Sequence, residues 1–270
     1  MTLRRALKAT PVPRFAPCLL ALVALLCGRP VGPNVTEVTA QSLRPVDTAL
    51  VLAIDISNSV DARRYRLQID GIADALEDPS VQAAIFGGPF QAIAIAIVLW
   101  ADRPRLALPW ARIAGTADAA ALAGRLRRLA RHGGEFTCVA EMMRFVADKI
   151  TPRIPMQATR VVLDVSGDGR ENCNPKPDTA AWRDELVALG LTVNGLSILE
   201  GDEGLGLAGW YRENVIGGPG SFVLPAQGFE EFGRAFRQKF VTEISGFRGT
   251  APKPETVQAA RRARFPTATP

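Results

Sequence analysis

Continuous apolar runs alternate along the chain with segments whose apolar residues recur at helical spacing. The runs are typical of strands buried on both faces, and they occupy residues 48–54, 91–100, 159–165 and 191–199. Shorter strands are expected at 104–110, returning beside 91–100, and at 221–225. Helices are expected at 61–77, 118–131, 138–150, 179–189, 206–215 and 228–245. The alternation predicts an α/β fold, a doubly wound and mostly parallel sheet with helices on both faces.

The two ends of the chain differ from the middle in their pattern. A basic start precedes the apolar run 18–27, which is short for a membrane-spanning helix and suits the apolar part of a secretory signal. Small residues at 38–40 provide a cleavage site, so the sequence predicts a signal peptide over 1–40, with an uncleaved anchor as the alternative. A flexible basic tail is expected over 247–270, which leaves one domain at 41–246.

Charge and composition narrow the classes of function. Of the formal net charge of +5, residues 1–40 and 247–270 carry +4 each, so the middle of the chain carries −3. A nucleic-acid-binding core is therefore not expected, nor is a stable membrane span after cleavage. The signal predicts an exported protein, periplasmic or secreted, in a compartment where disulfides form. The single histidine, His132, excludes a site with several histidine ligands.

Short side chains that carry oxygen atoms lie where the predicted parallel strands end. Asp55, Ser57 and Ser59 follow the first strand at alternate positions. Thr137 follows a Gly-Gly turn, and Asp168 lies between two glycines after a later strand. Ligands of such sheets bind beyond the carboxyl ends of the strands, and a hard divalent cation prefers oxygen ligands. These loops together predict a cation site.

Each motif also has a purely structural interpretation. Ser59 or Asn58 would cap the helix that begins near Asp61, and Asp168 would form an ordinary Asp-Gly turn. Asp164 lies inside a predicted strand and is expected to be a buried structural carboxylate without an assigned task.

Three sequence segments resemble those of a known family. They are VDTALVLAIDISNSVD, VVLDVSGDGREN, and WYRENVIGGPGSFV followed by GFEEFGRAFRQK. Through them the chain resembles DUF1194, a family of exported bacterial proteins of unknown function that is similar to the von Willebrand factor type A domain. The resemblance covers roughly residues 45–246 and implies the Rossmann-like fold of that domain.

The resemblance implies roles for the residues at the strand ends, because von Willebrand A domains combine these elements in a metal-ion-dependent adhesion site (MIDAS). The hydroxyls of Ser57 and Ser59 are expected to bind the cation directly, and Thr137 directly or through water. Asp55 and Asp168 are expected to accept hydrogen bonds from metal-bound water. Mg²⁺ is the expected cation, with Mn²⁺ or Ca²⁺ as alternatives. Such a cation keeps enough charge to take an acidic side chain from a partner protein.

The implied function is metal-dependent protein–protein binding rather than catalysis. A metal-dependent hydrolase that uses Asp55 and Asp168, and a structural domain with an unoccupied site, are the alternatives. The resemblance also places the loops of Cys138 and Cys173 side by side and implies a disulfide between them, with two free thiols as the alternative. Phe136 is bulky where the family's turn is often smaller, so it is expected either to alter access to the site or to supply an apolar contact at its rim.

Overall fold

The computed structural model describes residues 44–173 and 178–245, so the predicted signal peptide and basic tail lie outside the described residues. A six-stranded sheet has the order β3-β2-β1-β4-β5-β6. Its strands are β1 (Val46–Asp55), β2 (Ile93–Trp100), β3 (Arg105–Ile113), β4 (Ala158–Gly167), β5 (Leu191–Ile198) and β6 (Val223–Ala226). All neighbouring strands pair in parallel except β3, which returns antiparallel beside β2. The predicted α/β class and the returning strand are confirmed.

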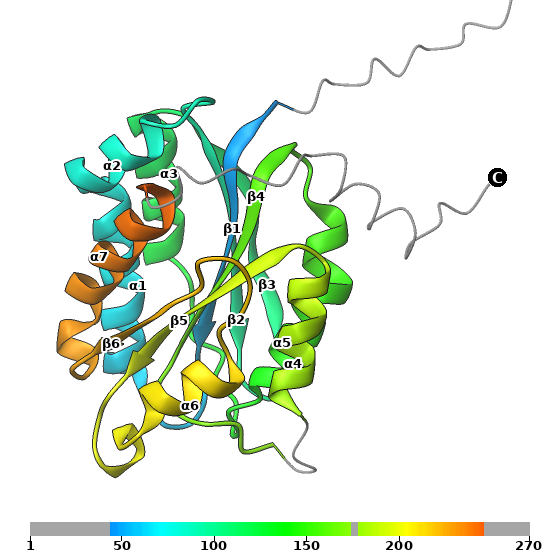
Figure 1. Cartoon of the computed structure of the whole chain (residues 1–270). Helices are drawn as coiled ribbons and strands as arrows, with labels where there is room; N and C mark the ends of the chain where they lie inside the picture. The colour runs from blue at the N-terminus through cyan, green and yellow to red at the C-terminus, as the bar shows by residue number, and fades with distance from the viewer. Residues whose placement is uncertain (1–43, 174–177, 246–270) are drawn as a thin grey trace, which may run out of the picture. The chain divides into compact units, whose positions relative to one another are not determined.

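Helices cover both faces of this sheet (Figure 1). One face carries α1 (Ala62–Glu77), α2 (Pro79–Phe86), α3 (Thr116–Arg127) and α7 (Phe232–Ser245). The other carries α4 (Val139–Phe145), α5 (Thr179–Ala188) and α6 (Leu207–Asn214). None of the helices in the described ranges is long and apolar enough to cross a membrane.

Two helical details differ from the prediction. The helix α2 was not predicted, although Asp78 caps it by accepting a hydrogen bond from Ser80 N at 2.8 Å, with Pro79 in its first turn. The segment expected as one helix over 138–150 is α4 followed by a π-helical turn, Val146–Ile150. Short helices of this kind depend on local capping and packing, which apolar periodicity does not report.

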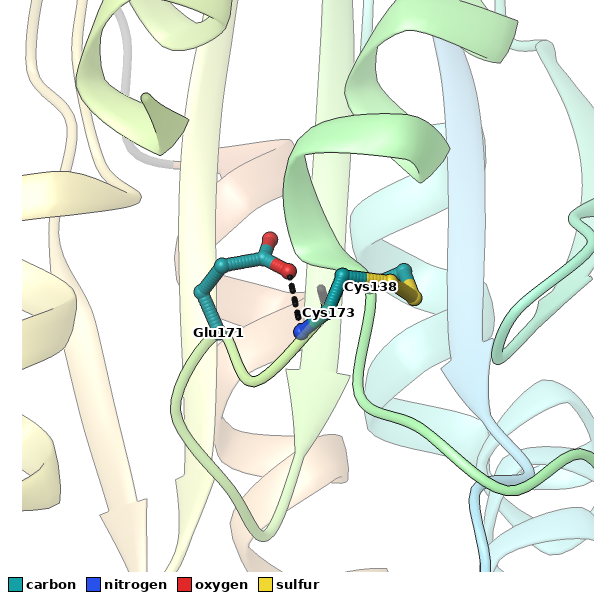
Figure 2. A group of neighbouring side chains, drawn as sticks. All are labelled: Cys138, Glu171 and Cys173. Carbon is teal, nitrogen blue, oxygen red and sulfur yellow. Dashed lines mark hydrogen bonds between the residues drawn. A yellow bond between two sulfur atoms is a disulfide. The ribbon is translucent and has the colours of Figure 1, made fainter. Parts of the chain in front are cut away.

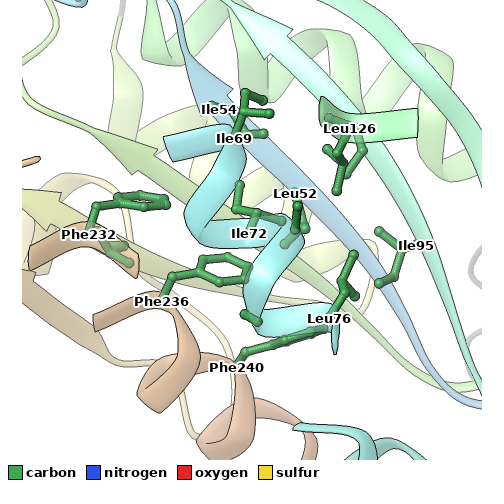
Figure 3. Close-up of a cluster of buried hydrophobic side chains, with 14 of the residues drawn as sticks. Leu52, Ile54, Ile69, Ile72, Leu76, Ile95, Leu126, Phe232, Phe236 and Phe240 are labelled. Atoms are coloured by element: carbon green, nitrogen blue, oxygen red, sulfur yellow. The ribbon is translucent and has the colours of Figure 1, made fainter. Parts of the chain in front are cut away.

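Alternation along the strands divides the core into two layers. Leu52, Ile54 and Ile95 face α1, α3 and α7, where they pack against helical side chains that include Ile72 and Phe236 (Figure 3). The intervening strand residues, such as Val51 and Ala53, face α4, α5 and α6. Because side chains alternate between the faces, Asp55 at the end of β1 belongs to the second layer.

A buried ion cluster joins α7 to the sheet. The ammonium of Lys239 is fully buried, lies 2.6 Å from Asp164 Oδ1 and also pairs with Glu243. Asn194 on β5 donates a hydrogen bond to Glu243 Oε1 at 2.8 Å. Burial and the charge of Asp164 raise the pKa of Glu243 to about 7 against the opposing effect of Lys239. Asp164 therefore has a partner from α7, which the sequence did not indicate.

The two outer strands are irregular. The ladder between β2 and β3 shifts register near Ile97, close to Pro109 on β3. The strand β6 is short and contains Pro225. The regular strands are therefore the inner ones. Of the predicted site residues, Asp55, Ser57, Ser59 and Asp168 lie at or just after the ends of two of these strands, β1 and β4.

Candidate metal centre

The serines and the asparagine of the loop after β1 do not cap the helix α1 that follows. The first turn of α1 is capped by Asp61, whose Oδ1 accepts a hydrogen bond from Arg64 N at 2.8 Å. The alternative that Ser59 or Asn58 caps this helix is therefore wrong. Ser57 and Ser59 are left with their hydroxyls turned to other partners.

Those partners connect the ends of β1 and β4. Asp55 Oδ1 accepts a hydrogen bond from Ser57 N at 2.8 Å, and the hydroxyls of Ser57 and Ser59 lie 3.3 Å apart. Ser59 Oγ donates to Asp168 Oδ1 at 2.7 Å, across 109 residues of sequence. Asp168 is therefore more than a local Asp-Gly turn, because its carboxylate reaches the loop of another strand.

Thr137 brings a third loop to the same place. Its side chain is buried, and a Cβ atom added at Gly169 would lie 3.2 Å from Thr137 Oγ1. Asn172 fixes its backbone on both sides: Thr137 N donates to Asn172 Oδ1 at 2.7 Å, and Asn172 N donates to Thr137 O at 3.1 Å. The Gly-Gly turn before it is joined to the first loop, because Gly134 N donates to Ile56 O at 3.3 Å. The structure thus brings together all three predicted loops.

A disulfide and a carboxylate clamp two of these loops together. Cys138 and Cys173 are bonded, with their Cα atoms 5.3 Å apart, which confirms the predicted pair. Glu171 beside them is buried and accepts a hydrogen bond from Cys173 N at 3.1 Å (Figure 2). It also accepts one from Ala140 N at 2.8 Å. These three side chains have the chemistry of metal ligands and lie close together. Because the two sulfur atoms are bonded to each other, the group serves as a clamp in this state.

The carboxylates of Asp55 and Asp168 lie close together, and a positive charge between them would stabilise their ionised forms. Asp55 is fully buried, and burial together with the charge of Asp168 raises its pKa from 3.8 to about 7, although hydrogen bonds from Ser57 and from the backbone of Asp168 oppose the rise. Among the described residues, no lysine or arginine pairs with Asp55, and its Oδ2 atom has no hydrogen-bond partner of good geometry. Two buried carboxylates beside three hydroxyls are a donor set that fits a divalent cation.

Arg131 supports the site in a way that the sequence did not indicate. Its guanidinium donates to the carbonyl oxygens of Ile56 at 3.3 Å and Ser57 at 3.1 Å. Arg131 lies past the end of α3 at Arg127, and only the tertiary structure shows that it reaches the first loop. The roles of Glu171 and Asn172 were missed for a similar reason, since polar residues after Asp-Gly are ordinary in loops.

A hollow lies beside Asp168 at the ends of β4 and β5. It has a volume of about 420 Å³, and its lining is made up of Gly169, Arg170, Glu171, Asn172, Asp202 and Leu205. Arg170 spans two loops by donating to Leu205 O at 3.0 Å. Leu205 is 72% exposed, and Phe136, next to Thr137, is 39% exposed. Two exposed apolar side chains and the positively charged guanidinium of Arg170 therefore lie near the candidate centre.

A family model for proteins of unknown function, DUF1194, matches residues 45–248. The chain belongs to the DUF1194 family. A search of curated proteins finds no match for this DUF1194 chain.

Solved structures similar to this DUF1194 chain contain von Willebrand A folds. Proximal thread matrix protein 1 from the mussel byssus, determined with a zinc-occupied MIDAS motif, is 16% identical, with a TM-score of 0.54 over 74% of this chain and 46% of the other. A von Willebrand factor type A protein from Catenulispora acidiphila is 14% identical, with a TM-score of 0.52 over 74% of this chain and 43% of the other. This chain spans less than half the length of each of these proteins, and at such identities the likeness establishes the fold.

Proposed function

We propose that this DUF1194 chain is an exported binding module that holds a divalent cation between its three loops, two of them clamped together by the disulfide, and uses the cation to bind an acidic side chain of a partner protein. The proposal is carried by the convergence of two buried carboxylates, Asp55 and Asp168, with the hydroxyls of Ser57, Ser59 and Thr137. The zinc-occupied MIDAS motif of the similar byssus protein supports this use of the fold.

The proposed ligands divide into two groups. Ser57, Ser59 and Thr137 bind the cation through neutral hydroxyls, while Asp55 and Asp168 accept hydrogen bonds from its water ligands. Bound there, the cation, which we propose is Mg²⁺ with Mn²⁺ or Ca²⁺ as alternatives, supplies positive charge that attracts a carboxylate. Neutral ligands offset little of that charge, so an acidic side chain of the partner is bound in preference to a neutral one.

The rim residues shape the partner surface in this proposal. Phe136 is an exposed apolar side chain beside Thr137, Leu205 is another on the loop after β5, and Arg170 adds a positive charge beside Leu205. A partner segment that places apolar residues beside its acidic residue would shield the carboxylate from water. The clamp of Cys138 and Cys173 lowers the cost of binding by holding the loops in place beforehand.

We infer export to the periplasm, with secretion as the alternative. The basic and apolar start of the chain supports a signal peptide over 1–40, followed by the domain at 41–246 and a basic tail over 247–270. The disulfide supports export as well, because such bonds persist in oxidising compartments.

Thermal unfolding with added salts tests cation binding. MgCl₂, MnCl₂, CaCl₂ or ZnCl₂ is expected to raise the melting temperature, because a ligand at 100 times its Kd stabilises a protein by about 2.7 kcal/mol. The Ser57→Ala and Asp55→Asn variants are expected to lose this rise. Asp148→Ala, which removes an exposed aspartate, is the matched control and keeps it. A wild-type protein that none of the four salts stabilises would rule out the cation site.

Affinity capture from the cell envelope tests the binding role. Partners are expected on the wild-type protein in MgCl₂ and to be lost in chelator and on Ser57→Ala. Capture that is equal in all three conditions would show that the cation has no part in binding.

A further inference from the structure

Asp55 of the candidate metal centre belongs to a row of residues at the ends of four adjacent strands. Asp55 on β1 pairs with Trp100 on β2, and Gly167 on β4 pairs with Ser197 on β5. The parallel register that pairs Ile54 with Ser166 places Gly167 next to Asp55. These four residues therefore occupy one level of adjacent strands, and the alternation along each strand turns them toward the face that α6 covers.

Four buried polar atoms of this row and of α6 lack hydrogen bonds. They are Asp55 Oδ2, Trp100 Nε1, Ser197 Oγ and the hydroxyl of Tyr211, none of which has a partner of good geometry among the described residues. All four residues are fully buried. Their chemistry is complementary, since the indole only donates, the carboxylate only accepts, and the hydroxyls do both. Buried polar groups in native proteins are nearly always satisfied, by one another or by ordered water.

Two glycines place the hydroxyl of Tyr211 beside Asp55. A Cβ atom added at Gly167 would lie 2.8 Å from that hydroxyl and 2.9 Å from Asp55 Oδ2, so both oxygens border the space that the missing side chain leaves. A Cβ atom at Gly195 would lie 2.6 Å from Cδ1 of the same ring. The ring of Tyr211 thus needs both glycines in order to enter the sheet face at this point.

We propose that Tyr211 is a positioning residue for the metal centre, and that its hydroxyl, with Trp100, Ser197 and buried water, holds Oδ2 of Asp55 in the orientation that cation binding requires. The inference rests on the proposed function, which makes Asp55 part of a cation site. It means that α6, which lies outside the three loops, also helps to position the ligands of that site. Partners that orient the ligands of a metal typically change its affinity 10- to 100-fold when they are removed.

Calorimetric titration with MgCl₂ and MnCl₂ tests the proposal. Tyr211→Phe removes one oxygen atom and is expected to bind both cations 10- to 100-fold more weakly than the wild-type protein. Tyr65→Phe is the matched control, because it makes the same change in α1, where the hydroxyl donates to Leu129 O at 3.2 Å. This control is expected to lower the melting temperature while leaving cation affinity unchanged.

The outcomes separate the two proposals. Wild-type affinity in Tyr211→Phe would overturn the positioning role alone, whereas a wild-type protein that binds neither cation would overturn the proposed function and this inference with it. Should Tyr211→Phe fail to fold, Ser197→Ala carries the same test with the loss of one hydroxyl. A high-resolution crystal structure is expected to contain water bonded to the Tyr211 hydroxyl and to Asp55 Oδ2, and a dry site without a direct bond between them would contradict the proposal.

Discussion

Asp55 combines full burial with a neighbouring carboxylate, and its pKa of about 7 lies above its ordinary value of 3.8. An unfolded chain loses this proton near pH 4, while the folded chain keeps it up to about pH 7. The folded state therefore binds more protons over this interval, so the contribution of Asp55 to the free energy of unfolding falls as the pH rises from 4 to 7. Keeping the ionised carboxylate buried therefore lowers the free energy of unfolding. A bound cation that requires this ionised carboxylate would offset the loss.

Cation affinity is expected to rise with pH between 5.5 and 7.5. Binding below pH 7 must displace the proton of Asp55, which costs up to tenfold in affinity for each pH unit. Titrations with MgCl₂ at pH 5.5, 6.5 and 7.5 measure this. Glu243→Gln, which changes the buried acid next to Lys239, serves as control and is expected to keep the same dependence. A pH-independent affinity would contradict the role of Asp55.

Asp55→Asn is expected to stabilise the metal-free protein. The substitution removes a buried charge that costs free energy at pH 8 and matters little at pH 4, where the folded protein already carries the proton. Thermal unfolding in chelator should show a higher melting temperature for the variant at pH 8 and no gain at pH 4. A lower melting temperature at pH 8 would mean that the charge has a partner which outweighs its burial.

At the scale of elements, the residues at the strand ends were predictable from the sequence. The residues of other elements that contact and position them were not. Parallel strands and polar residues just after them suffice to place Asp55 and Asp168 at one edge of the sheet. The contacts of Glu171, Arg131 and Tyr211 depend on which elements meet in three dimensions, and their sequence neighbourhoods resemble ordinary loop and helix surfaces. The disulfide came from family resemblance, since spacing alone leaves the pairing open.

Loss of the disulfide is expected to weaken both the fold and the centre. Closing a loop between residues 35 positions apart stabilises a protein by about 3–4 kcal/mol through the unfolded state. Urea unfolding of the Cys138→Ser/Cys173→Ser variant should reveal this decrease, and MgCl₂ titration should show weaker binding. Reductant should affect the wild-type protein in the same way and leave the variant unchanged. Equal unfolding midpoints with and without reductant would contradict the prediction.

At the scale of the whole molecule, the doubly wound sheet followed from the apolar pattern, but the attachment of α7 did not. Its Lys239 is fully buried, although a lysine in an amphipathic helix is ordinarily exposed. The pattern of α7 shows only that Phe232, Phe236 and Phe240 form one apolar face. That Asp164 provides the counter-charge from the sheet face that α7 covers is a tertiary fact, and it explains a charged residue inside a buried strand.

Lys239→Met is expected to lower the free energy of unfolding by about 3–5 kcal/mol at pH 7.5, because it leaves the carboxylates of Asp164 and Glu243 buried without a cation. Chemical denaturation measures the change. Arg63→Ala is the matched control, since its ion pair with Glu230 is exposed and should contribute less than about 1 kcal/mol. A Lys239→Met protein as stable as the wild type would show that the cluster does not secure α7.

Both outer strands of the sheet contain a proline, Pro109 in β3 and Pro225 in β6, whereas the four inner strands contain none. Proline has no N–H group, so an incoming strand cannot form an uninterrupted ladder along either side. Edge-to-edge aggregation, in which molecules join their sheets into a continuous one, is thereby discouraged. Such protection suits the exported binding module that we propose, which would meet other proteins without the help of cytosolic chaperones.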